Sequence, residues 1–307
     1  MMKDPVNRLL LCILSLALMA MAGCSGGNGW TVKDRQLQSG WQLQSSAGVT
    51  AGDEQVSTPG FIPQNWYAAE IPGSVLGSLV ADSVYKNIFF HRNLEKIPDS
   101  LFNVPWWYRR AFELTNFDSG QVYRLRFNGI SYRADIWLNG KKIAAADTLA
   151  GSFRQYTINI TPYVKTGENV LALKVTRAKA GELNIGFVDW NPEPADHNMG
   201  IWRSVHLLAT GPVSIEKPFV KTRVDTATLE HADISLSLML HNYSDKAING
   251  TLKAAIGKDI HLSKVVALEA GESKKISLDP AEYAALSMDH PRLWWTRALG
   301  KPNLYSL

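Results

Sequence analysis

Residues 106–114 read WWYRRAFEL, and residues 122–127 read VYRLRF. In both stretches aromatic and aliphatic residues alternate with polar ones, which is the pattern of a β-strand with one buried face. Residues 135–138 then run into Asn139-Gly140, a dipeptide that strongly favours a two-residue hairpin turn, and residues 141–144 return as the partner strand. These stretches predict antiparallel sheet.

Further short strands are expected on both sides of this region, at residues 37–45, 156–160 and 169–175. One helix interrupts them, because apolar residues fall at helical spacing over residues 74–80, directly after Pro72-Gly73. Short strands at a spacing of roughly ten residues, with turn residues between them, indicate an all-β sandwich.

A second unit is expected after Gly211-Pro212. Strand patterns recur at residues 234–240, 250–255 and 274–278, a spacing that suits an immunoglobulin-like sandwich. The antibody cysteine pair is missing, and the chain ends within the strand pattern. We therefore expect one sandwich over residues 36–211 and a truncated, incomplete one over residues 212–307.

The N-terminus has the composition of a targeting segment. Lys3 and Arg8 precede an apolar run that is short for a bilayer span and ends in Met21-Ala22-Gly23-Cys24. This resembles a bacterial lipoprotein signal, with residues 1–23 removed, Cys24 lipidated, residues 24–35 as a tether and the protein held in the cell envelope, periplasmic or at the outer-membrane surface. A plain secretory or anchor segment, which would leave Cys24 as a free thiol, is the alternative.

The stretch from Asp189 to Met199 is predicted to be a loop, because Pro192 and Pro194 lack an N–H and push their preceding residues away from helix. A strand is expected to begin at Gly200. Carboxylate, amide and indole groups on such a loop suit sugar recognition. The plainer alternative is that Asp and Asn close turns and that Trp190 covers a core edge.

Four runs of this sequence resemble glycoside hydrolase family 2, within it the exo-β-glucosaminidase and β-mannosidase branch. They are Trp106–Arg110, residues 136–140, residues 167–173 and the stretch from Asp189 to Arg203. The resemblance implies a jelly-roll, galactose-binding-like domain followed by an immunoglobulin-like domain. It also implies a carbohydrate partner with β-linked glucosamine or mannose.

The resemblance implies a role for the loop in particular. In the mannosidase branch an Asp-Trp-Gly-Pro run reaches the terminal sugar; here Asp189-Trp190 and Pro192 match it, whereas Asn191 replaces the glycine, which favours the glucosaminidase type. Asp189 is the expected hydroxyl or amine acceptor and Trp190 the platform. Further substrate-binding candidates are Asp196 and Asn198. Arg203 is expected to pair inside the sheet.

The family's two catalytic glutamates lie about 5 Å apart on a (β/α)8 barrel. Nothing in these 307 residues reads as that barrel, so no catalytic residue is assigned. The seven histidines show no metal-ligand spacing, and no phosphate-binding or nucleophile motif occurs, so no metal or cofactor is expected. With a net charge of +4 and no basic run, nucleic acid is not an expected partner.

Two hypotheses follow. In the first, the chain is the non-catalytic N-terminal part of a family 2 retaining exo-glycosidase and contributes a loop to its terminal-sugar pocket. In the second, it is a free-standing carbohydrate-binding surface lipoprotein without hydrolase activity.

Overall fold

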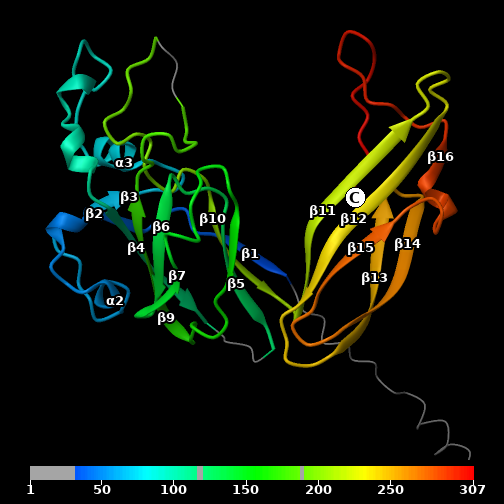
Figure 1. Cartoon of the computed structure of the whole chain (residues 1–307), viewed down its shortest axis with the longest axis horizontal. Coiled ribbons are helices and arrows are strands. Elements are labelled where there is room, and N and C mark those ends of the chain that lie inside the picture. Colours follow the sequence, from blue (N-terminus) through cyan, green and yellow to red (C-terminus); the bar gives the residue numbers. More distant parts are fainter. Residues whose placement is uncertain (1–31, 116–119, 187–189) are drawn as a thin grey trace, which may run out of the picture. The chain divides into compact units, whose positions relative to one another are not determined.

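The computed structural model describes residues 32–115, 120–186 and 190–307 (Figure 1). The predicted signal segment, with Cys24, lies outside the described residues, and so does Asp189. Within the described part, none of the helices has the length and apolar character needed to cross a membrane.

The strands before residue 211 form two antiparallel sheets. The four-stranded sheet has the order β1 (Lys33–Gln36), β10 (Val205–Thr210), β5 (Val122–Phe127) and β8 (Tyr156–Asn159). The six-stranded sheet has the order β3 (Tyr67–Ala69), β2 (Trp41–Ser45), β4 (Trp106–Leu114), β9 (Gly167–Thr176), β6 (Arg133–Leu138) and β7 (Lys141–Ala144). The predicted all-β jelly-roll sandwich is confirmed.

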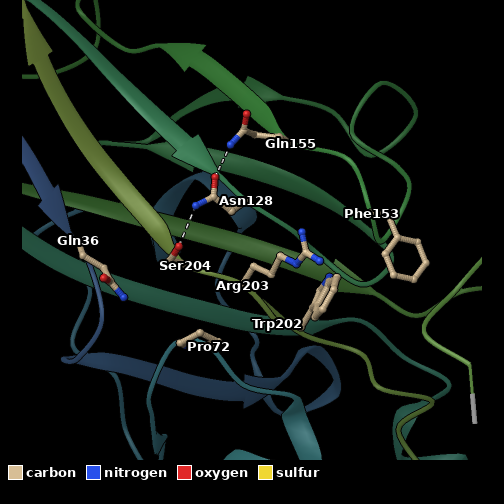
Figure 2. A pocket seen from close by; sticks show the side chains of 8 residues that line it. All are labelled: Gln36, Pro72, Asn128, Phe153, Gln155, Trp202, Arg203 and Ser204. Carbon is tan, nitrogen blue, oxygen red and sulfur yellow. Dashed lines mark hydrogen bonds between the residues drawn. The ribbon is translucent and has the colours of Figure 1, made fainter. Parts of the chain in front are cut away.

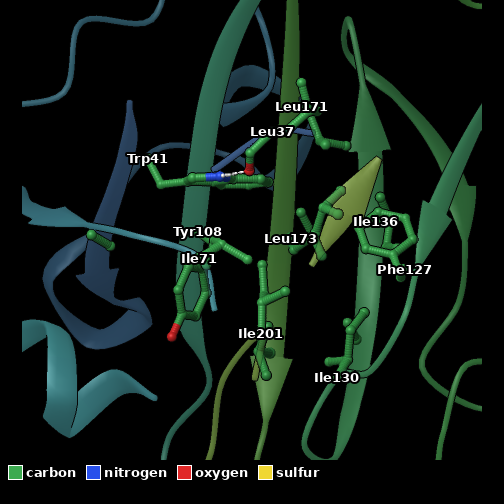
Figure 3. Packing of buried hydrophobic residues seen from close by; sticks show 14 of the residues in the cluster. Leu37, Trp41, Ile71, Tyr108, Phe127, Ile130, Ile136, Leu171, Leu173 and Ile201 are labelled. Carbon is green, nitrogen blue, oxygen red and sulfur yellow. Dashed lines mark hydrogen bonds between the residues drawn. The ribbon is translucent and has the colours of Figure 1, made fainter. Parts of the chain in front are cut away.

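The main hydrophobic core lies between these sheets (Figure 3). Strand β4 sends Tyr108 and Phe112 into it, while Trp107 on the opposite face packs against Trp137 with ring centroids 5.2 Å apart. The prediction of a half-buried β4 is therefore wrong for Trp106–Arg109, whereas Ala111 and Glu113 are exposed as it expects. Its outer face is covered by residues 56–61, whose backbone oxygens accept hydrogen bonds from the buried Arg109 guanidinium.

The predicted turn and helix are both present. Asn139 and Gly140 have φ angles of 52° and 81°, the positive values that a type I′ hairpin turn requires. Helix α3 spans Val75–Ala81, and the Ser74 hydroxyl caps it by accepting from the Gly77 N–H at 3.0 Å. The remaining short helices are α2 (Asp53–Val56), η1 (Ser46–Gly48), η2 (Leu94–Lys96), η3 (Asp99–Phe102) and η4 (Ala284–Leu286).

The strands after residue 212 form the immunoglobulin-like part. Strands β11 (Val213–Val224), β12 (His231–Asn242) and β15 (Ser273–Leu278) form one sheet, with β16 (Ser287–Asp289) also paired to β12. Strands β13 (Ile248–Ile256) and β14 (Ile260–Leu268) form the other. Alternate residues of β12 are buried, and they join apolar residues of both sheets in a second core. The exact domain boundaries stay a prediction.

The expected strand at Gly200 begins five residues later, at Val205. Gly200 forms only an isolated bridge with Ser131, and the indole N–H of Trp202 donates to the Ser152 carbonyl at 2.7 Å. Residues 201–204 are therefore held by loops rather than by a neighbouring strand. This irregular segment joins the candidate loop to the sheet.

Candidate functional site

The segment from Trp190 to Met199 contains neither helix nor strand, as its prolines predict. The Trp190 side chain is 83% exposed, which disagrees with the alternative that it covers a core edge. Its role as a sugar platform stays a prediction. Asp189 precedes it outside the described residues. The loop thus presents a large ring to solvent, and its far end is held firmly.

Asp196 holds the loop from inside. Its side chain is fully buried, and its carboxylate accepts from the Leu76 N–H at 2.7 Å and from the Asn198 N–H at 3.0 Å. Burial raises the pKa of the Asp196 carboxyl, and these hydrogen bonds oppose that shift. A ligand in solvent cannot reach this group, so Asp196 acts as a fastening of the loop to helix α3 rather than as a sugar contact.

Backbone hydrogen bonds continue this fastening. The Val75 N–H donates to the Met199 carbonyl at 2.8 Å, and the Gly73 N–H donates to the Ile201 carbonyl at 3.0 Å. Between these two bonds Gly200 lies so close to its neighbours that a Cβ atom would stand 2.6 Å from the Gly73 oxygen. Only glycine fits there.

Asn184 fastens the other side of the loop. Its amide donates to the His197 carbonyl at 3.0 Å, and its oxygen accepts from the hydroxyls of Ser131 and Ser152. The Asn198 side chain, a predicted substrate contact, donates to the Ile185 carbonyl at 3.4 Å. Residues 184–185 and 197–198 are therefore joined side to side.

A chain of charged groups lies on the outer side of the loop. The His197 ring contacts a Glu193 oxygen at 2.6 Å through Nδ1 and an Asp99 oxygen at 3.0 Å through Nε2. The Arg177 guanidinium reaches the same Asp99 oxygen at 2.6 Å and also donates to the Asn103 amide oxygen. The bond from Arg177 holds the pKa of Asp99 below its ordinary value.

A cavity of about 830 Å³ opens beside this chain of groups. Its lining includes Arg177, Lys179, Glu182, Asn184, Glu193 and His197. Amides, carboxylates and cations together provide donors and acceptors for the hydroxyl or amine groups of a sugar. Ala178, Ala180, Leu183 and Ile185 also line the cavity, so its wall combines these polar groups with an apolar surface.

Among the residues that the structure describes, Asp196 and Asp99 do not form a hydrolytic pair of carboxyls. A general acid needs a carboxyl that keeps its proton and can reach the ligand. Asp196 has the raised pKa without the access, and Asp99 has the access with a lowered pKa. In the described residues no group of three or more potential metal ligands occurs either.

The loop could be predicted from the sequence, but the side chains that hold it in place could not. Asp99, Arg177 and Asn184 come from segments far away in the chain, and no local pattern marks them. Arg203, expected to pair inside the sheet, is instead exposed, with its guanidinium 4.2 Å from the ring centre of Trp202. That prediction is wrong because the strand starts beyond it.

Comparison with known proteins assigns this architecture. Residues 41–185 match the galactose-binding-like domain of glycosyl hydrolase family 2, and residues 213–307 match a second domain of the same family. The chain belongs to glycoside hydrolase family 2.

Relatives point to one branch of the family. The chain is 35% identical over 269 residues to an exo-β-D-glucosaminidase of Streptomyces avermitilis, a match covering 87% of this chain and 29% of that protein. It is 26% identical to a mannosylglycoprotein endo-β-mannosidase of Lilium longiflorum, covering 88% of this chain and 31% of that one.

The fold agrees with a solved structure from the same branch. The exo-chitosanase CsxA of Amycolatopsis orientalis superimposes with a TM-score of 0.81 at 30% identity, over 89% of this chain and 31% of that one. The family 2 chain thus spans about three tenths of the length of the curated relatives it matches.

Proposed function

We propose that these residues form the non-catalytic N-terminal part of a retaining exo-glycosidase of the β-glucosaminidase type. The loop of Asp189 and Trp190 would provide one wall of the pocket for the terminal sugar. The observation that carries this proposal is the combination of an indole exposed to 83% with a loop fastened at its far end by the buried Asp196.

An exposed aromatic ring on a loop that is fastened at its far end suits an exo-acting enzyme, because the terminal sugar must be kept in one orientation during the reaction. In family 2 the acid/base and nucleophile belong to a (β/α)8 barrel, where a separation of about 5 Å gives retention of configuration. Bond cleavage would therefore be carried out by such a barrel, and the present loop would contribute binding and orientation. The similarity to glucosaminidases and the Asn191 substitution favour an amino sugar over mannose.

The test compares two proteins on p-nitrophenyl β-D-glucosaminide. The 307-residue chain by itself is expected to release no nitrophenol, whereas the product of the coding region read beyond codon 307 is expected to release it. Sequencing of the DNA and transcript across that codon shows whether a barrel follows in frame. Robust hydrolysis by the 307-residue chain would overturn the proposal, and a purely binding, free-standing protein would be indicated if no barrel follows.

We further propose that Cys24 carries a lipid and that the protein is held in the bacterial cell envelope. The support is the apolar run after Lys3 and Arg8 and its end in Met21-Ala22-Gly23-Cys24. Cells grown with radiolabelled palmitate should yield labelled protein, and Cys24→Ser should abolish the label. Labelling that persists in Cys24→Ser would contradict the lipidation of Cys24. A wild-type protein that carries no label and is recovered in the soluble fraction would contradict it as well.

A further inference from the structure

A second cavity, of about 770 Å³, lies on the jelly-roll domain and is lined by none of the residues that line the first (Figure 2). Figure 2 shows Phe153 and Trp202 on one side and the amide side chains of Gln36, Asn128 and Gln155 around the rest. The family resemblance gave this cavity no role.

On the aromatic side of the cavity, the Trp202 indole is held by a hydrogen bond and a ring contact. The Trp202 indole donates to the Ser152 carbonyl at 2.7 Å, and Phe153 meets its ring edge-on with centroids 5.6 Å apart. Gly129 permits this packing, because a Cβ atom there would lie 2.7 Å from the Trp202 nitrogen. Phe153 nevertheless remains 49% exposed, so about half of its surface is open to a ligand.

The polar side is partly committed and partly free. Asn128 donates to the Ser204 hydroxyl at 2.8 Å and accepts from the Gln155 amide (Figure 2). Within the described residues neither the Gln155 oxygen nor the Gln36 amide has a hydrogen-bond partner. Both side chains are exposed, and an amide can donate to a hydroxyl group through its nitrogen and accept from one through its oxygen.

Arg203 supplies the charge of the cavity. Its guanidinium lies over the Trp202 ring, and in the part of the chain that the structure describes it forms neither an ion pair nor a side-chain hydrogen bond. The cavity lining includes no Asp or Glu. An arginine that has donors to spare and no acidic neighbour attracts a carboxylate and disfavours an ammonium group.

We propose that this cavity is a second glycan-binding site, selective for an acidic sugar. The ring of a hexuronate would pack on Phe153, its hydroxyls would bond to Gln36 and Gln155, and its carboxylate would bond to Arg203. This site is separate from the proposed amino-sugar pocket at Trp190, and its charge selects against glucosamine.

The experiment is an NMR titration of the 307-residue chain with sodium glucuronate, compared with glucose, glucosamine and acetate. Glucuronate is expected to bind about tenfold more tightly than glucose, because charge-assisted bonds to arginine are among the strong ones. Acetate and glucosamine are expected to bind more weakly than glucose. Arg203→Gln should remove the preference for glucuronate, and Phe153→Ala should weaken both sugars.

Matched controls are the exposed residues Arg223 and Phe219 of β11, whose changes Arg223→Gln and Phe219→Ala should leave every affinity unchanged. Trp190→Ala should also leave glucuronate binding unchanged, which separates this site from the proposed terminal-sugar pocket. Equal affinities for glucuronate and glucose, equal affinities for glucuronate and acetate, or an unchanged preference in Arg203→Gln would each overturn the proposal.

Discussion

The buried carboxylate of Asp196 joins the loop to helix α3. It satisfies the N–H groups of Leu76 and Asn198, one on a helix and one on the loop. Removing such an acceptor leaves two donors without a partner, and each unsatisfied buried donor costs about 1–3 kcal/mol. Asp196 is thus one of the contacts that hold the loop, beside Asn184 and the backbone hydrogen bonds of Met199 and Ile201.

We therefore expect Asp196→Ala to lower the free energy of unfolding by about 2 kcal/mol or more, measured by urea denaturation. The matched control is Asp82→Ala at the other end of helix α3, because Asp82 is exposed and should change stability by less than about 0.5 kcal/mol. Equal effects of the two substitutions would show that Asp196 does not hold the loop.

The pH dependence of this residue has a definite sign. Burial raises the pKa of Asp196 in the folded state. A raised pKa contributes stability that is fully present below the unfolded pKa of about 3.9 and is lost as pH rises through the folded pKa. The free energy of unfolding of the wild type minus that of Asp196→Asn should thus fall as pH rises above about 4. A difference that grows with pH would contradict the raised pKa.

Residues that act through long-range contacts could not be predicted from the sequence. Trp190 was predictable because its proline-rich surroundings force a loop, and it is exposed as that prediction requires. Asp196 was recognised as a polar loop residue, but its burial depends on helix α3, far away in the chain. Arg203 was predicted to lie inside the sheet, but Gly200 and Trp202 bind to loops and β10 begins only after them.

At the scale of elements, the close contact between the loop and helix α3 depends on Gly200. Its φ angle of 152° and the 2.6 Å approach of the Gly73 oxygen to a Cβ leave no space for a side chain. Gly200→Ala should lower the free energy of unfolding by about 2–4 kcal/mol, since backbone atoms rather than flexible side chains must move.

The control is Gly250→Ala in β13, where a Cβ atom would meet nothing within 4 Å. This change should be neutral or slightly stabilising in thermal denaturation, because alanine restricts the unfolded chain. A similar loss of stability in both variants would show that the backbone near Gly200 adapts freely.

Most elements could be predicted because their alternation is local. The strands β4, β5, β7 and β12 and the hairpin turn were all expected from the sequence. β11 and β14 were missed, since both expose large residues such as Phe219 and Val265 that blur the alternation. Packing on both faces of β4 was also missed, because the covering loop comes from residues distant in the sequence.

At the scale of the whole molecule, the described residues contain two main cores that share no residue. Leu171→Ala lies in the first and Leu238→Ala in the second, and each should cost about 2–5 kcal/mol. Hydrogen exchange should therefore rise in residues 37–209 for the first variant and in residues 231–289 for the second. Exchange that rises throughout the chain in both variants would show a single cooperative unit.

The central claim is that this chain provides a wall of the terminal-sugar pocket in a family 2 exo-glycosidase. The most direct measurement is kcat/KM for p-nitrophenyl β-D-glucosaminide hydrolysis by the product of the intact coding region, with Trp190→Ala compared with Trp294→Ala. Both tryptophans are exposed, but Trp294 is outside the loop. A loss of about tenfold in Trp190→Ala alone is predicted, because an aromatic contact contributes about 0.5–1.5 kcal/mol beyond the area that it buries. A value within twofold of the wild type in both variants would contradict the claim.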